Sequence, residues 1–291
     1  MNTTEKHRYP IPDFRDLDPN FGYNYKDIID AVLNETHIDV TGIPEYLYLY
    51  RGNQSYIIDI IKNEYFHLSR ADQFEDPADC GVPKKKFFSF VKRKRINITN
   101  TKIENKYQEF INEIRTNTIV CSLTFANDNE SMWDEYANQK TGICIEYNIK
   151  EYFSKNNKHL VLYPVIYTDE IEKILPLAVK KEEIPFSNKN GKYITSYSSN
   201  RELEFEFSPG IINLLSICKI PKYKFEKEWR FFDRTQEGEK GRKESCPISK
   251  IYLGPNFYIN PQKDEILNTI KEKNINFVQT RFENDRIIVE E

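Results

Sequence analysis

The chain has 291 residues, a formal net charge of -3, and 39% hydrophobic and 14% aromatic residues. This length suffices for one large domain or two small ones, with tyrosine and phenylalanine supplying much of the core. The slightly acidic total excludes an overall positive field of the kind that drives non-specific nucleic-acid binding, so such binding has to be local. Five singly scattered cysteines and the lack of a membrane-length apolar run predict a reduced, cytoplasmic protein without membrane contact.

The chain is predicted to have two parts. Residues 1–44 form an N-terminal extension with one helix around residues 25–34, where Ile28, Ile29 and Val32 recur on one face. Gly42 and Pro44 mark its end. Residues 45–291 form a single α+β domain of catalytic type.

The domain opens with a strand, Glu45 to Arg51, whose sequence is E-Y-L-Y-L-Y-R. A turn at Gly52 and a helix over Ser55 to Asn63 follow it. Arg51 therefore ends an apolar strand close to a helix start. Such an arginine is either a solvated strand terminus or an anchor for an anion.

An acidic loop and a basic stretch come next. The acids of the loop match no calcium-binding spacing, so we expect turn and capping roles and no metal: Asp72, Glu75, Asp76 and Asp79. The basic stretch, residues 83–97, interleaves phenylalanines with seven cations: Lys84, Lys85, Lys86, Lys92, Arg93, Lys94 and Arg95. It is either a surface for nucleic acid or an acidic partner, or a mobile insertion with apolar anchors. An amphipathic helix through Ile103, Phe110 and Ile114 follows.

Residues 118–147 predict a strand, a polar turn, a short helix and a second strand. Ser122 and Thr124 place two hydroxyls on one side of the first strand, which core packing does not explain. Ser131 is the expected N-cap of the helix. Trp133 and Tyr136 share one face of that helix.

Residues 160–169 predict a further strand, and a helix is expected over residues 201–219. The segment Phe225–Phe232 then reads F-E-K-E-W-R-F-F, and strict alternation places Glu226, Glu228 and Arg230 on one strand face. Crowded carboxylates in a cleft shift each other's pKa values, as active sites require. The alternative is an exposed strand face on which Arg230 screens its neighbours. A strand over 249–253, a helix over 262–272 and two short strands complete the chain.

Several of these pieces together resemble a bacterial family known as domain of unknown function 2971. They are Y-L-Y-L-Y-R, F-E-D-P-A-D, C-S-L-T-F with M-W-D-E-Y-A, T-G-I-C-I-E-Y, F-E-K-E-W-R-F-F and I-S-K-I-Y-L-G-P, in this order from about Glu45 to near the C-terminus. Two departures are Glu75, where the family more often has Asn, and the basic insertion at 83–97. The family name states that no activity is established, so the resemblance implies a fold more than a function.

The order of parts is also similar to that of the ADP-ribosyltransferases, which have an arginine ending an early strand, then a strand with Ser and Thr, and finally a Glu-X-Glu strand. This resemblance implies an α+β fold with a single mixed or antiparallel sheet, whole or split, and flanking helices. It also implies site roles in which NAD is a substrate. Arg51 holds the pyrophosphate, Ser122 with Thr124 braces the ribose or the carboxylate, and Tyr136 or Trp133 stacks on nicotinamide. Glu228 stabilises the oxocarbenium-like state, and Glu226 orients or deprotonates the acceptor.

Three hypotheses of function follow. The first is a NAD-consuming ADP-ribosyltransferase, a toxin or anti-phage defence effector that modifies a protein or a nucleic acid. The second is a metal-dependent nuclease that uses the acids of the loop and of the Glu-X-Glu segment. The third is a non-enzymatic binding module. Convergence of Arg51, Ser122 and Glu228 on one concave pocket is the structural test between the first and the third.

Overall fold

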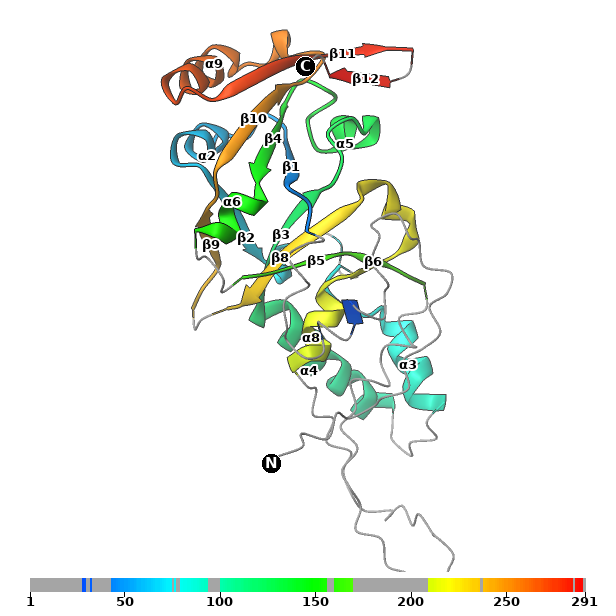
Figure 1. The fold of residues 1–291 in the computed structure, drawn as a ribbon. Coiled ribbons are helices and arrows are strands. Elements are labelled where there is room, and N and C mark those ends of the chain that lie inside the picture. The colour runs from blue at the N-terminus through cyan, green and yellow to red at the C-terminus, as the bar shows by residue number, and fades with distance from the viewer. Residues whose placement is uncertain are drawn as a thin grey trace, which may run out of the picture.

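The computed structural model describes residues 28–29, 32, 43–74, 76, 79–93, 100–155, 160–169, 209–235, 238–284 and 286–289, with only the backbone of 90–93 and 209–212. Its centre is a ten-stranded sheet in the order β12-β11-β10-β4-β1-β3-β2-β9, with β8 on the other edge of β3 and β5 beyond β8 (Figure 1). The strands are β1 (Tyr46–Arg51), β2 (Tyr65–Arg70), β3 (Thr118–Thr124), β4 (Ile143–Asn148), β5 (Val161–Pro164), β8 (Glu228–Arg234), β9 (Gly241–Ser245), β10 (Ile248–Leu253), β11 (Asn276–Glu283) and β12 (Arg286–Val289). A separate parallel pair is formed by β6 (Ile166–Tyr167) and β7 (Cys218–Lys219).

Strand β3 is the point at which the sheet divides. One of its edges pairs with β8 over the whole strand, from Thr118 opposite Arg234 to Thr124 opposite Glu228. Its other edge pairs with β1 only at Thr124 and with β2 only at Ile119 and Val120. β1 and β2 therefore separate from β3 beside Ser122. The α+β class and the flanking helices are as expected from the sequence, and the sheet is mixed, since β10 and β11 run parallel.

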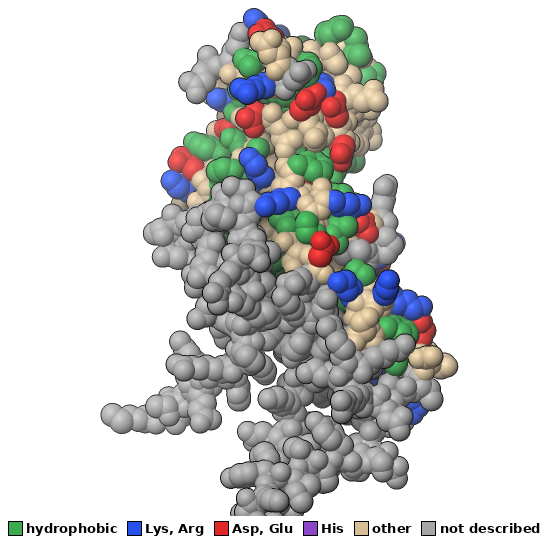
Figure 2. All heavy atoms as spheres, turned by 90° about the vertical axis from the view of Figure 1, so that its right-hand side faces the viewer, with side chains coloured by type: hydrophobic (Ala, Val, Ile, Leu, Met, Phe, Trp, Pro, Cys, Tyr) green, Lys and Arg blue, Asp and Glu red, His purple; other side chains and the backbone are tan. Residues whose placement is uncertain are grey.

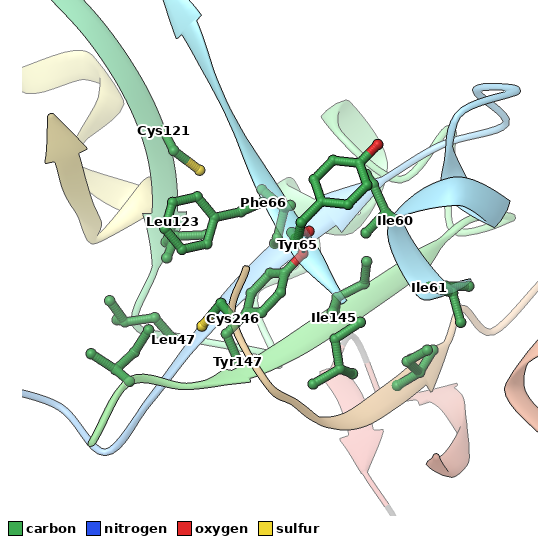
Figure 3. Packing of buried hydrophobic residues seen from close by; sticks show 14 of the residues in the cluster. Leu47, Ile60, Ile61, Tyr65, Phe66, Cys121, Leu123, Ile145, Tyr147 and Cys246 are labelled. Carbon is green, nitrogen blue, oxygen red and sulfur yellow. Dashed lines mark hydrogen bonds between the residues drawn. The ribbon is translucent and has the colours of Figure 1, made fainter. Parts of the chain in front are cut away.

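The largest hydrophobic cluster lies between one face of the curled sheet and three helices. These are α2 (Ile57–Asn63), α6 (Ile149–Ser154) and α9 (Lys263–Glu272). Figure 3 shows the centre of this cluster, where aliphatic side chains of β1 and β4 meet aromatic rings of β2 and β4. The buried hydroxyl of Tyr147 donates a hydrogen bond to the Tyr65 carbonyl at 2.7 Å, so this polar group is not left unsatisfied in the core.

The opposite face of the sheet carries two smaller clusters. One lies under α5 (Glu130–Glu135) and contains Trp133 and Tyr50. The other lies among α3 (Lys84–Arg93), α4 (Asn100–Asn117) and α8 (Pro209–Ser216), at the lower end of the sheet in Figure 1. Ile28, Ile29 and Val32 are helical and buried in this second cluster.

Three short 3-10 helices complete the described chain: η2 (Ala71–Gln73), η4 (Pro221–Glu226) and η5 (Phe257–Ile259). One expectation is corrected by the local geometry. The N-cap of α5 is Asn129, whose side chain accepts from the Met132 amide at 3.3 Å, and Ser131 lies inside the helix. The basic stretch begins as the helix α3, which Phe87 anchors to α4 by packing against Phe110. Among the described residues, none of the helices has the length and apolar character needed to cross a bilayer.

Candidate functional site

The segment that carries the two glutamates is a 3-10 helix followed by a strand. Pro221 occupies the first turn of η4, where a missing amide proton costs nothing. The chain then reverses at Lys227, whose φ of 45° and ψ of 48° lie in the left-handed region. The prediction of one continuous strand over 225–232 is therefore wrong. Glu226 ends η4, and β8 begins only at Glu228.

The two carboxylates nevertheless meet, through a lysine that the sequence interpretation did not single out. The ammonium of Lys219, at the end of β7, donates to Glu226 Oε2 at 2.5 Å and to Glu228 Oε2 at 3.1 Å. Both glutamates are buried, with relative exposures of 3% and 2%. A single cation thus bridges the pair and offsets part of their mutual repulsion.

Arg230 is the second cation, and it is fully buried. Its Nε donates to Glu228 Oε1 at 2.7 Å, and its Nη2 donates to Glu228 Oε2 at 3.2 Å and to Asp79 Oδ1 at 2.7 Å. Its Nη1 donates to the Ser216 carbonyl at 2.6 Å and contacts Cys80 Sγ at 3.2 Å. The alternative of an exposed face screened by Arg230 is therefore wrong, because Arg230 lies at the centre of a buried ion network.

We call this group the carboxylate network: Asp79, Lys219, Glu226, Glu228 and Arg230. The pKa values of its two glutamates are shifted in opposite directions. Burial alone would raise the pKa of Glu228, but the charges of Arg230 and Lys219 and the Ser122 hydroxyl lower it to about 2. Burial and the charge of Glu228 raise the pKa of Glu226, against the opposing effect of Lys219. Glu228 is consequently ionised at neutral pH, and Glu226 is the member that more readily takes a proton.

Two polar side chains connect the network to the surface. Tyr136, at the C-terminal end of α5, is 39% exposed and donates its hydroxyl to Glu226 Oε1 at 2.7 Å. Ser122 is exposed on β3 directly opposite Arg230, at the point where the sheet divides. Tyr136 and Ser122 are therefore the neighbours of the two glutamates that reach the surface.

Thr124 and Trp133 lie in the same region, but their side chains are buried and make structural contacts. The Thr124 hydroxyl donates to the Glu226 carbonyl at 2.6 Å and accepts from the Ala126 amide at 3.2 Å. Thr124 thereby fixes the end of η4, and its side chain is 1% exposed. Trp133 is fully buried edge-on against Tyr50, and its indole nitrogen donates to the Asn127 carbonyl at 2.9 Å. Neither side chain offers a surface to a ligand, which corrects the expectation that Trp133 stacks on one.

Arg51 does not join the carboxylate network. Tyr48 lies opposite Thr124, which shares a sheet face with Glu228, so Arg51, three residues further along β1, starts from the other face. Burial raises the pKa of the Cys121 thiol; the charge of Arg51 lowers it and the charge of Glu228 raises it further. Ser122 and Glu228 therefore lie on one sheet face, and Arg51 starts from the other, so the three side chains do not converge.

The half-buried guanidinium of Arg51 is poorly satisfied where it lies. Its Nη1 donates to the Tyr50 carbonyl at 3.0 Å, whereas its buried Nε has no hydrogen-bond partner. Desolvation and the positive charge of Arg51 lower the pKa of His67. Among the described residues no acid forms an ion pair with Arg51, so this cation remains available to an anion.

The acids of the loop are dispersed. Asp72 pairs with Arg70 at 2.7 Å, Asp76 accepts from the Tyr223 hydroxyl at 3.3 Å, and Asp79 belongs to the carboxylate network. Glu75 lies outside the described residues. The part of the chain that the structure describes contains no group of three or more histidine, cysteine or acidic residues arranged to hold a metal ion.

The basic cluster is only partly described. Lys84 pairs with Glu104 at 2.6 Å, Lys86 donates to the Asp169 carbonyl at 2.9 Å, and Lys85 is exposed. The side chains of Lys92 and Arg93 and the residues Lys94 and Arg95 lie outside the described part. These lysines are on α3 and take no part in the carboxylate network.

The described molecule is thus an α+β protein with a divided sheet and a buried carboxylate network. Residues 132–231 match the model of a family described as a protein of unknown function (DUF2971). The match confirms the family resemblance for this segment, which contains Tyr136, Lys219 and both glutamates. Neither the curated proteins nor the solved structures gave a match to the chain.

Proposed function

We propose that the protein is a NAD-consuming enzyme of the ADP-ribosyltransferase type. The observation that carries the proposal is that the Ser122 hydroxyl hydrogen-bonds Glu228 on one sheet face, beside a second carboxylate with a higher pKa, Glu226. The strands that hold the Arg, Ser and Glu positions of the resemblance, β1, β3 and β8, are also neighbours in the sheet. The three-residue convergence that was set as the test of an enzyme is not met, because Arg51 lies on the other side of β3. The proposal therefore rests on Ser122 and the two glutamates, and the position of Arg51 favours the alternative of a non-enzymatic binding module.

The proposed chemistry divides between the two glutamates according to their acidity. When the bond between nicotinamide and the ribose carbon C1′ breaks, its electron pair leaves with nicotinamide. The ionised carboxylate of Glu228 then stabilises the positive charge that develops on the ribose. The acceptor nucleophile, or water in its absence, forms the new bond to C1′ and gives its proton to Glu226, whose raised pKa makes it the better base. The exposed ring of Tyr136 supplies a face for nicotinamide.

The test is the release of nicotinamide from NAD by the purified full-length protein, followed by chromatography. Glu228→Gln should reduce release by about 10²–10³-fold, the usual effect of removing one group that stabilises transition-state charge. Because Glu228 also neutralises Arg230, circular dichroism has to show that the variant is folded. Ser122→Ala tests the same site on an exposed residue and should reduce release by about 10-fold.

Ser154→Ala is the matched control. Ser154 is an exposed serine on α6 that bonds only its own helix, at the Glu151 carbonyl, and its loss should leave release unchanged. No nicotinamide release by the wild-type protein would refute the proposal. So would wild-type rates in folded Glu228→Gln and in Ser122→Ala.

A further inference from the structure

The main sheet ends at three strands of the described chain, β9, β5 and β12, which differ in how the free edge is protected. β9 carries Arg242, Lys243 and Glu244 at its centre, and β5 ends at Pro164, which has no amide proton to donate. Charged residues and proline on an edge strand hinder pairing with another strand. β12 reads R-I-I-V, with one charge at its first residue and no proline. Of these three edges, that of β12 is the least protected.

Strand β12 uses one of its two edges. It pairs with β11 over its whole length, from Val289 opposite Thr280 to Arg286 opposite Glu283 (Figure 1). Its other edge forms no backbone hydrogen bond with the described residues. Figure 2 views the molecule from the side on which the turn between β11 and β12 lies in Figure 1, and its upper part shows hydrophobic side chains between basic and acidic ones. The sheet can therefore be extended here by an added strand.

The side chains of β12 alternate between a covered face and an open face. Ile287 is 6% exposed, and Val289 packs against the same cluster under α5. Ile288 is 38% exposed. Arg286 is also exposed and has no hydrogen-bond or ion-pair partner within the described part of the chain. The open face thus offers an apolar side chain and an unpaired cation.

We propose that β12 pairs antiparallel with β12 of a second copy of this chain, so that one sheet continues across a two-fold axis. Directly opposite residues of an antiparallel pair lie on the same face, and successive residues of a strand alternate between the faces. The two-fold axis must therefore pass through a residue position and not between two positions. This condition leaves few registers to compare.

Centring the axis on Ile288 gives a complementary register. Ile288 then lies opposite Ile288 of the partner subunit, and Ile287 lies opposite Val289 of the partner subunit. Because the sequence continues with a glutamate, Arg286 falls opposite Glu290 of the partner subunit. A centre at Ile287 would set Arg286 against the partner's Ile288, and a centre at Val289 would set Ile288 against the partner's Glu290. Of these three registers, only the first joins apolar residues to each other and opposite charges to each other, and both kinds of pair stabilise a sheet.

The shortness of β12 sets the strength of the association. Its four residues bury far less surface than the roughly 1,600 Å² of a standard stable interface. We therefore expect a weak dimer, with a dissociation constant of about 10–100 μM. The proposal is independent of the proposed enzyme chemistry, since association is measured in the absence of NAD.

Sedimentation equilibrium of the full-length protein between about 1 and 300 μM measures the dimerisation constant. Ile288→Lys places two ammonium groups opposite each other and should weaken dimerisation about 10-fold or more. Arg286→Glu should weaken it about 2- to 30-fold, because two symmetry-related charge pairs are lost, and adding Glu290→Arg should restore it. Phe277→Lys is the matched control, since Phe277 is 40% exposed on β11 outside the segment paired with β12, and it should leave dimerisation unchanged.

A disulfide tests the register. The five native cysteines are buried, so Ile288→Cys introduces an exposed thiol. Opposite residues of an antiparallel pair have Cβ atoms about 4.5–5.5 Å apart, close to the separation in a disulfide. Diamide, which takes up two electrons and two protons from two thiols, should convert this variant to a covalent dimer and leave Phe277→Cys monomeric.

Three results would overturn the proposal. The first is a protein that stays monomeric at about 300 μM, which would leave β12 to a strand of a different protein. The second is Ile288→Lys that dimerises as tightly as the wild type. The third is Phe277→Cys that cross-links as fast as Ile288→Cys.

Discussion

Replacing Arg230 with methionine should destabilise the protein strongly. The substitution removes five polar contacts of a fully buried guanidinium and leaves Glu228 and Asp79 facing each other without it. Breaking a buried ion pair by removing one partner typically costs about 3–5 kcal/mol, because the remaining charge is desolvated and unpaired. Domains have total stabilities of about 5–15 kcal/mol, so Arg230→Met should remove a large part of the unfolding free energy.

Urea denaturation followed by tryptophan fluorescence measures this loss, since Trp133 and Trp229 are both buried and report on the folded core. Arg242→Met is the matched control. Arg242 also pairs with two acids, Asp233 at 2.8 Å and Glu239 at 2.9 Å, but its side chain is 23% exposed. Its loss should cost about 0–1 kcal/mol.

A double substitution separates the cost of leaving the Glu228 charge unpaired from the cost of replacing the arginine side chain itself. Glu228→Gln in the Arg230→Met background should restore part of the lost stability, with a coupling energy of about 0.5–3 kcal/mol. A loss of less than about 1 kcal/mol in Arg230→Met, or a loss equal to that of Arg242→Met, would contradict the buried network as a determinant of stability.

Three further predictions concern pH and packing. Because the folded-state pKa of Glu228 is lowered to about 2, its stabilising contribution is present above pH 4.5 and is lost as the pH falls toward 2, so Glu228→Gln should be more destabilising at pH 7 than at pH 3. The folded-state pKa of Glu226 is raised, so ionisation of Glu226 destabilises the folded protein as the pH rises. The stability of Glu226→Gln relative to wild type, measured by urea titration, should therefore increase from pH 4 to pH 8. A flat or falling difference would contradict the raised pKa. Gly142→Ala should cost about 3 kcal/mol by thermal or urea unfolding, because the new methyl group would lie 2.0 Å from the Arg51 carbonyl oxygen. Gly238→Ala meets no atom within 4 Å and carries only the backbone strain of a φ of 77°, so it should cost less, about 1–2 kcal/mol.

The periodic segments of the fold were predictable from the sequence. Apolar residues that recur every 3.6 positions predict the first helix of the domain and the α4 helix, in which Ile103, Phe110 and Ile114 are buried. Short apolar segments predict the first strand and the strands around Ser122 and Tyr147. The first helix and the α4 helix bury one face each, so hydrophobic periodicity specifies them. The strands β3 and β4 are buried on both faces, and their signal is a short, nearly continuous apolar run.

The carboxylate network was only partly predictable. Alternation failed at Lys227, since a lysine in the left-handed region gives no signal of the kind that glycine or asparagine gives. The partner of Arg230 lies 151 residues away at Asp79, so no local pattern could show that Arg230 is buried. The face of Arg51 likewise depends on the register of Tyr48 with Thr124, which the hydrophobic pattern of β1 alone does not fix.

The turn at Lys227 also explains how two glutamates of opposite acidity coexist. A continuous strand would place Glu226 and Glu228 in equivalent positions on one face, where each would raise the pKa of the other. The left-handed residue instead leaves Glu226 at the end of η4, beside the exposed Tyr136, while Glu228 begins β8 against Arg230. Asp79 and Ser122, which complete this environment, lie outside the segment that matches the family model. The difference in acidity on which the proposed chemistry depends is therefore a property of the whole domain, and it should be lost in the isolated 132–231 segment.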